Sequence, residues 1–434
     1  MLKKFKCINL VFQVFTFGLN HLIKRSNKMK RFIIVLLVSF ISINSYAQNE
    51  GSEITIGVHH TIKSSILDQD RTIQVYTPDG YDESEQSYPV LYVLDGQEYF
   101  MLGIAYQEML AFRDKTPKFI VVGINTDRQK RRVLFYEESD KFISFMETEL
   151  IPYIDAAYRT KMEQERIYFG WEMGAGLGFE VLTDKNNLFS AFILASPTHS
   201  TDKRMGKVKL LKNDLVKSNK FILVSAAPEE HWITQDSTFL SIIQEPSNAE
   251  YQWRSTVFDR EDHYTTPLKT IHEGLSDYFS DYKPIRLRSL KAYDEYGGLD
   301  ALRAYYKKRG ERYDLPTDIH KETKHFLVYN AMSEDNYERF NFYIDEFDDF
   351  LGSVSRDFWL DRFASYYLQN ANSEEALLIY ENGIKRFPNS AVLHEGKGDV
   401  YLATNQRKKA LRAYEKSLEL DSDQPEVKAK IESF

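Results

Sequence analysis

The eight residues from Phe169 to Gly176, FGWEMGAG, have the spacing of a nucleophile elbow but carry an unexpected residue at its centre. A nucleophile elbow has the pattern Gly-x-Ser-x-Gly and is a sharp strand-to-helix turn that exposes the serine hydroxyl. Gly170 and Gly174 occupy the glycine positions, whereas Glu172 occupies the serine position. No other Gly-x-Ser-x-Gly occurs in the chain, so the usual nucleophile is absent. We expect Glu172 to lie in a turn of strained backbone geometry.

The segments around this turn predict the strand and the helix that it needs. Residues 165–168 form a β-rich run, and an apolar helical pattern follows from Leu177 to Leu182. The same alternation continues from Glu53 to about Asp281, with helical stretches such as 141–158. Several of the β-rich runs are continuously apolar, which indicates strands buried on both faces of a parallel sheet. This region is therefore predicted to have an α/β fold. Its clearest strands are residues 72–76, 90–94, 119–124, 192–195 and 221–224.

The last third of the chain has a different pattern and repeats itself. Residues 293–434 are rich in Glu, Lys, Leu, Ala and Tyr and contain no convincing strand. At four positions the same amino acid occurs again 34 residues further along the chain. A spacing of 34 residues is the period of tetratricopeptide helix pairs. We predict an earlier, degenerate pair at 320–350 and a short helical cap at 425–434. The repeated residues are Tyr367 and Tyr401, Leu368 and Leu402, Ala376 and Ala410, and Tyr380 and Tyr414.

The N-terminus carries the pattern of a secretory signal peptide. Met29-Lys30-Arg31 precedes an apolar run of ~10 residues, and Ser45-Tyr46-Ala47 follows it. The apolar run is too short for the ~20 residues that a membrane span needs. We therefore expect cleavage after Ala47 and a periplasmic or secreted protein with no membrane span. Met29 is the expected start, and the only cysteine, Cys7, would be lost with the leader.

These patterns divide the chain into four parts and exclude some partners. The expected parts are an N-terminal extension with signal peptide (1–47), an α/β domain (48–281), a helical linker (282–316) and the helical repeats (317–434). The net charge is −8 and no basic run stands out beyond the N-terminus, which argues against a nucleic-acid partner. No cluster of histidines and carboxylates supports a metal site, and we expect no cofactor.

Segments of the α/β part resemble the putative esterase family of α/β-hydrolases, which includes enterochelin esterases and S-formylglutathione hydrolases. The resemblance runs along most of Ile62 to Phe279 and depends on both the order and the spacing of the segments. It implies an α/β-hydrolase fold, with a mostly parallel sheet and helices on both faces. The segments are SSILDQDRTIQVYTPDGY, YPVLYVLDGQEYF, FIVVGINTDRQKRRVLF, FISFMETELIPYIDAAYRT, RIYFGWEMGAGLGFEVL, FSAFILASPTH and DREDHYTTPLKTIHEGLSDYF.

The resemblance also implies which residues would form the catalytic site. In this family a histidine removes the proton of the elbow serine, and an acidic residue orients the histidine. The histidine position falls on His263, and the acid position falls on Glu230 or Glu229, after the strand at 221–224. The oxyanion hole would use the backbone N–H groups of Met173 and Gln97.

Glu172 changes the chemistry that this site can perform. A carboxylate that attacks an ester forms a mixed anhydride, and because carboxylate leaves more readily than alkoxide, the attack mostly reverses. The longer glutamate side chain also disturbs the attack geometry. We expect serine-type ester hydrolysis to be lost. Glu172 would then bind the Met173 N–H, pair with His263, or activate a water as a general base.

Two functions follow from these alternatives. In the first, the exported protein is degenerate as a serine esterase and acts in binding or scaffolding, with a small ester or acylated ligand at the site and a protein partner on the helical repeats. In the second, it is an active hydrolase of carboxylic esters, of the siderophore or acyl-sugar type, that uses a mechanism without serine.

Overall fold

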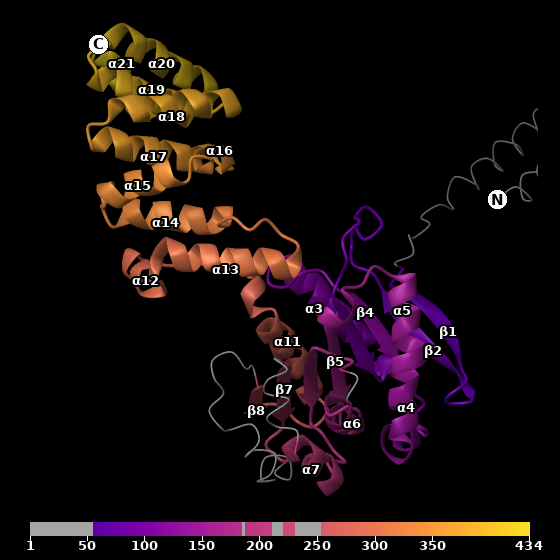
Figure 1. The fold of residues 1–434 in the computed structure, drawn as a ribbon. Helices are drawn as coiled ribbons and strands as arrows, with labels where there is room; N and C mark the ends of the chain where they lie inside the picture. Colours follow the sequence, from indigo (N-terminus) through magenta and orange to yellow (C-terminus); the bar gives the residue numbers. More distant parts are fainter. Residues whose placement is uncertain (1–54, 185–186, 211–219, 231–252) are drawn as a thin grey trace, which may run out of the picture. The chain divides into compact units, whose positions relative to one another are not determined.

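The computed structural model describes residues 55–184, 187–210, 220–230 and 253–434 (Figure 1). The expected signal peptide at 1–47 and Cys7 lie outside the described residues. An eight-stranded sheet with the order β1-β2-β4-β3-β5-β6-β7-β8 forms the first half. β1 and β2 pair antiparallel, as do β2 and β4, and all the other pairs are parallel. The mostly parallel sheet that the sequence predicts is therefore present.

The buried strands of this sheet are continuously apolar. Every residue of β3, β4, β5, β6 and β7 is buried, because helices cover both faces of the parallel part. The two edge strands, β1 and β8, are more exposed and have no such run. Neither is among the clear strands of the sequence, although His59 and His60 in β1 are interpreted from the sequence as exposed strand residues. The strands are β1 (Val58–Ser64), β2 (Gln69–Tyr76), β3 (Val90–Leu94), β4 (Ile120–Ile124), β5 (Arg166–Trp171), β6 (Ala191–Ala195), β7 (Phe221–Ala226) and β8 (Trp253–Val257).

Helices cover both faces of the sheet. One core joins α3 and α11 to one face, and a second core joins α4, α5 and α6 to the other. The single helix expected at 141–158 is present as α4 and α5 with a π-helical turn, η2, between them. The helices are α3 (Gly96–Ala111), η1 (Val133–Glu137), α4 (Ser139–Phe145), η2 (Met146–Leu150), α5 (Ile151–Ala157), η3 (Met162–Gln164), α6 (Met173–Leu182), α7 (Asp202–Leu210) and α11 (Thr266–Tyr278).

The second half is built of helices, and between Phe258 and Phe434 the structure contains no strand. Successive helices pack in pairs, α14 with α15, α17 with α18 and α19 with α20 (Figure 1). No helix in the described part of the chain is both long and apolar enough to cross a membrane. The helices are η4 (Ser280–Tyr282), α12 (Leu290–Tyr296), α13 (Gly298–Tyr313), α14 (Lys321–Ser333), α15 (Tyr337–Glu346), α16 (Phe350–Ser353), α17 (Asp357–Gln369), α18 (Ser373–Arg386), α19 (Ala391–Ala403), α20 (Arg407–Leu420) and α21 (Pro425–Glu432).

A polar network connects α13 to the strand that leads into the elbow. Arg312 on α13 donates through Nε to Glu165 Oε1 at 2.7 Å and through Nη1 to Asp281 Oδ1 at 2.9 Å. Glu165 is buried directly before β5 and also accepts from the Tyr278 hydroxyl at 2.6 Å. Because the guanidinium satisfies two carboxylates at once, this contact fixes α13 against the amino end of β5.

Candidate functional site

Glu172 lies in the turn between β5 and α6, with φ of 53° and ψ of −117°. A positive φ is strained for a residue with a side chain, and here the surrounding backbone holds it. The Glu172 N–H donates to the Ala195 carbonyl at 3.0 Å, and the Glu172 carbonyl accepts from the Thr198 N–H at 3.1 Å. A Cβ at Gly170 would lie 2.6 Å from the Gly174 backbone, so the turn needs glycine there. The turn therefore has the geometry of an elbow, with Glu172 at its centre.

The Glu172 carboxylate pairs with Arg131, which the sequence did not predict. Arg131 Nη1 donates to Glu172 Oε2 at 2.6 Å. Among the described residues, Glu172 forms no ion pair with His263 and no hydrogen bond to the Met173 N–H. Two of the three alternatives for Glu172, binding the Met173 N–H and pairing with His263, therefore do not occur in this structure. An arginine is the stronger partner because its guanidinium is always charged and matches a carboxylate in geometry.

Asp95 holds the same guanidinium from its other side. Arg131 Nε donates to Asp95 Oδ1 and Nη2 donates to Asp95 Oδ2, both at 3.0 Å. Asp95 directly follows β3 in the left-handed conformation, with φ of 52°, and precedes α3. Burial raises the pKa of Asp95 to about 6, and Arg131 opposes this rise. Arg131 thus bridges a buried carboxylate and the elbow carboxylate.

The base and acid positions are brought together. His263 Nδ1 lies 2.5 Å from Glu230 Oε1. The fully buried Glu230 carboxylate also accepts at Oε2 from the Ser196 hydroxyl at 2.8 Å and from the Ala227 N–H at 2.7 Å. Because Oε2 is occupied by two donors, Oε1 accepts the Nδ1 proton, and His263 presents Nε2 outward. Glu229, the other acid candidate, instead accepts from the His263 backbone N–H at 3.0 Å.

Trp171 lies beside both parts of the site. Its ring centroid is 4.9 Å from that of His263, and its Nε1 donates to the His263 carbonyl at 3.0 Å. The Arg131 guanidinium carbon lies 5.5 Å from the Trp171 ring centroid. The Trp171 indole therefore contacts His263 and also lies beside Arg131, the partner of Glu172.

The two expected oxyanion-hole residues each begin a helix. Met173 is the first residue of α6, and Gln97 is the second residue of α3. The first N–H groups of a helix have no acceptor within it, so these two groups can face a ligand. The Gln97 side chain accepts from the Thr126 N–H at 2.9 Å and fixes the start of α3.

Sequence reasoning gave no role to four polar residues of this region. Arg131 forms ion pairs with both Asp95 and Glu172, and Ser196 donates to Glu230. His199 follows β6 with φ of 56°, and burial lowers its pKa, with the Glu172 charge opposing this shift. Asp95, Ser196 and His199 all follow parallel strands at their carboxyl ends, which is the one sequence signal that could have gathered them.

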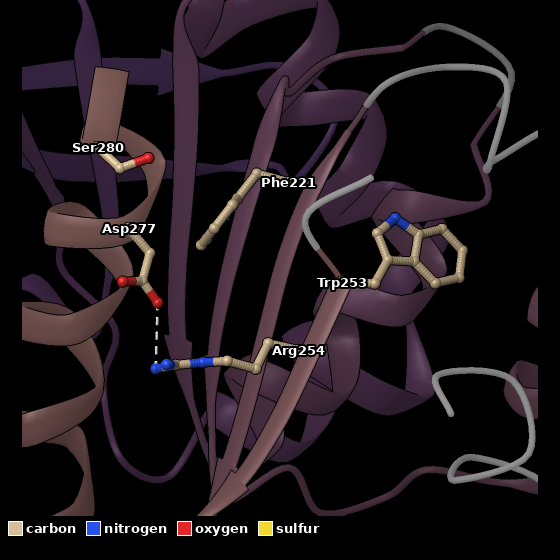
Figure 2. Close-up of a pocket in the computed structure, with 5 residues that line it drawn as sticks. All are labelled: Phe221, Trp253, Arg254, Asp277 and Ser280. Atoms are coloured by element: carbon tan, nitrogen blue, oxygen red, sulfur yellow. Dashed lines mark ion pairs between the residues drawn. The ribbon is translucent and has the colours of Figure 1, made fainter. Parts of the chain in front are cut away.

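One cavity of the described residues lies at the amino ends of strands β7 and β8 (Figure 2). It has a volume of about 320 Å³, and Arg254 pairs across it with Asp277 at 3.1 Å. Phe221 and Trp253 begin their strands, whereas the elbow and Glu230 follow the carboxyl ends of theirs. This cavity is therefore separate from the candidate site. Its lining residues are Phe221, Trp253, Arg254, Asp277 and Ser280.

Comparison with known proteins identifies the family. The model of the family described as Putative esterase matches residues 64–280, half of the chain. The chain belongs to the Putative esterase family. No curated protein matches it. The match covers strands β2 to β8, the elbow and His263, so the family assignment and the site geometry concern the same part of the molecule.

Solved structures are similar to this esterase-family chain in fold. An uncharacterised protein from Capnocytophaga ochracea has 17% identity and a TM-score of 0.52, over 87% of this chain and 98% of that one. An IroE-like serine hydrolase from Shewanella oneidensis has 18% identity and a TM-score of 0.47, over 66% and 97%. The enterobactin esterase FES from Shigella flexneri has 16% identity and a TM-score of 0.42, over 53% and 60%.

Among the described residues, no group of three or more metal-ligating side chains is arranged around a common point.

Proposed function

We propose that this esterase-family chain has no serine esterase activity and acts in binding or scaffolding. The observation that carries the proposal is the elbow carboxylate, Glu172, held by Arg131 where a free hydroxyl would have to stand. An acyl group transferred to that carboxylate would form an anhydride that returns to the ester more readily than it proceeds. Ser196, although bonded to Glu230, is fully buried and offers no replacement nucleophile.

The test is an ester panel with a restored serine. The mature protein should hydrolyse p-nitrophenyl acetate and butyrate no faster than buffer. Glu172→Ser should gain activity, because His263 and Glu230 already have base-and-acid geometry, and His263→Ala in that background should remove the gain. Ester hydrolysis by the unmodified protein, abolished by His263→Ala, would refute the proposal.

Ester hydrolysis by the unmodified protein, if His263→Ala abolishes it, would support the alternative function, which is hydrolysis of carboxylic esters without serine. The His263–Glu230 pair favours this alternative, since a histidine oriented by a buried carboxylate can take a proton from water. Glu172 could act as the base in the same way. A structural neighbour from Aspergillus nidulans is named a siderophore hydrolase, and a siderophore or acylated sugar is the substrate class we propose for this alternative.

We further propose that residues 317–434 are tetratricopeptide-like repeats that hold a protein partner, with 48–281 as the esterase-like domain and 282–316 as a helical linker. The 34-residue period and the full burial of Ala376 and Ala410 support this.

Ala410→Trp should overpack the α19–α20 crossing and lower the free energy of unfolding by roughly 1–3 kcal/mol. Lys408→Trp, on the exposed side of α20, is the control. Equal stability of the two variants would argue against the repeat register.

We also propose export to the periplasm or medium, with cleavage after Ala47 and no cofactor or nucleic-acid partner. The leader pattern that begins at Met29 supports this. N-terminal sequencing of the protein from a secreting host should begin at Gln48, and an intact leader would contradict export by this route.

A further inference from the structure

His263 has four polar groups, and side chains from other parts of the chain bind three of them. Its backbone N–H donates to Glu229 Oε1 at 3.0 Å, and its backbone carbonyl accepts from Trp171 Nε1 at 3.0 Å. Its ring Nδ1 lies 2.5 Å from Glu230 Oε1. Nε2 has no hydrogen-bond partner among the described residues, so this atom is left for proton transfer.

The three contacts of His263 restrict different parts of the residue. The bonds to its N–H and carbonyl hold the backbone, whereas the bond to Nδ1 holds the ring. A backbone N–H or carbonyl in a surface loop can also bond to water, so exchanging that water for a side chain adds only about 0.5–1.5 kcal/mol to stability. The two backbone contacts therefore matter more for the position of His263 than for the free energy of unfolding.

Trp171 is itself held rigidly. It is the last residue of β5 and pairs with Ala195 of β6. Its side chain is buried, and its ring lies edge-to-face with Tyr99 at a centroid distance of 5.9 Å. Glu172 is the next residue in the chain. The same strand end therefore carries the elbow residue and holds the backbone of His263.

We infer that Trp171, with Glu229 as a second contact, is a positioning residue that sets the place of His263 Nε2 relative to the side chain at position 172. The inference rests on the proposed function and deepens it, because it concerns the base that a serine at 172 would use. Glu230 binds only the ring of His263 and leaves its backbone free. Proton transfer needs heavy atoms within about 2.6–3.2 Å, and a misplacement of about 1 Å costs up to about 100-fold in rate.

The first measurement is NMR of the ring nitrogens of His263 in the isotope-labelled mature protein at alkaline pH, where imidazole is neutral. His263→Gln identifies the signals. We expect one dominant tautomer, with the proton on Nδ1. Trp171→Phe keeps an aromatic ring but removes the N–H, and it should give a mixture of the two tautomers. Trp253→Phe is the matched control and should keep the single tautomer, because Trp253 Nε1 also donates to a backbone carbonyl, that of Lys220, at 3.1 Å.

The second measurement is kcat and KM for p-nitrophenyl acetate in the Glu172→Ser background. Adding Trp171→Phe should lower kcat by about tenfold or more and change KM by less than about twofold, because the indole N–H acts through His263. Glu229→Ala should also lower kcat. Glu229→Gln should restore it, since the amide oxygen can still accept from the His263 N–H.

A single Nδ1–H tautomer in Trp171→Phe, or a mixture already present in the unmodified protein, would overturn the inference. Equal effects of Trp171→Phe and Trp253→Phe would do the same. Melting curves show whether each variant is folded, and if Trp171→Phe does not fold, the tautomer spectra of Glu229→Ala and Glu229→Gln decide. A Glu172→Ser protein without ester activity would contradict the account of the site under the proposed function, whereas the spectra of the unmodified protein and Trp171→Phe still decide the positioning role.

Discussion

Two carboxylates of the site, Glu230 and Glu172, have opposite surroundings. Glu230 is fully buried, accepts from three donors and positions His263. Glu172 is partly exposed and has one cationic partner, Arg131. The His263–Glu230 part therefore has a geometry suited to proton transfer, whereas the elbow part contains an ion pair. The elbow turn accommodates this ion pair within the same sheet that positions His263 and Glu230.

The largest expected effect is on the elbow part, from Arg131→Ala. Removing the guanidinium leaves Asp95 buried without its cation and Glu172 without its partner. Breaking a buried ion pair by removing one partner costs about 3–5 kcal/mol. Urea unfolding should show a loss of this size. Arg128→Ala removes an exposed pair with Glu98 and should leave the free energy of unfolding almost unchanged, because solvent screens the pair. Comparable losses in both variants would mean that Arg131 acts as a surface residue.

Asp95 should make the stability of the elbow part depend on pH. Burial raises its pKa in the folded protein from 3.8 to about 6. Folding therefore favours protonated Asp95, and this contribution is full below pH ~4 and disappears as pH rises through about 6. Two pKa units correspond to roughly 3 kcal/mol. The free energy of unfolding, relative to Asp95→Asn, should fall by up to that amount between pH 4 and pH 7.5.

The measurement is urea unfolding of both proteins at several pH values. Asp361 in the helical region, whose pKa burial also raises to about 6, is present in both proteins and cancels in the difference. Asp82→Asn, at an exposed position, is the control and should follow the unmodified protein. If Asp95→Asn and Asp82→Asn give the same pH profile, Asp95 has no raised pKa.

The strands and the elbow turn differ in how well they could be predicted from the sequence. The β-rich runs were predictable because a buried parallel strand is a local apolar pattern, and β3, at 90–94, matches it residue for residue. The edge strand β8 was missed because it is partly exposed and has no such pattern. The placement of Glu172 between strand and helix followed from two glycines in sequence.

The partner of Glu172 could not be predicted in the same way. Arg131 and Asp95 are far from the elbow in sequence, and only the sheet order brings the ends of β3 and β5 together. Nothing in a charged loop before a helix distinguishes Arg131 from Arg132, which pairs with Glu137 instead. The strand pattern is local, whereas the choice of ion-pair partner depends on tertiary packing. The Glu172–His263 pair, one of three alternatives that the sequence left open, is therefore not formed, while the resemblance supplied His263 and two candidates for its acid.

Glu230→Gln and Glu229→Gln test the acid part directly. In Glu230→Gln the amide keeps the shape, but its NH₂ faces donors, so at least one of Ser196, Ala227 and His263 loses its acceptor. A buried donor left without an acceptor costs about 1–3 kcal/mol. Glu229 is exposed, and its replacement should cost less than about 0.5 kcal/mol. Thermal melts of the two variants make the comparison, and a larger loss in Glu229→Gln would reverse the assignment of the acid.

Glu172→Gln should have a smaller effect than Glu230→Gln. The glutamine carbonyl can still accept from Arg131 Nη1, and Asp95 keeps the other two contacts of the guanidinium. The lost charge was partly exposed, so solvent already screened its attraction to Arg131, and the cost should be at most about 1 kcal/mol. Urea unfolding of Glu172→Gln beside Glu230→Gln compares the loss of one negative charge at nearly constant shape in the two parts of the site. If Glu172→Gln is as destabilising as Glu230→Gln, the elbow carboxylate is as fully integrated into the buried polar network as the acid.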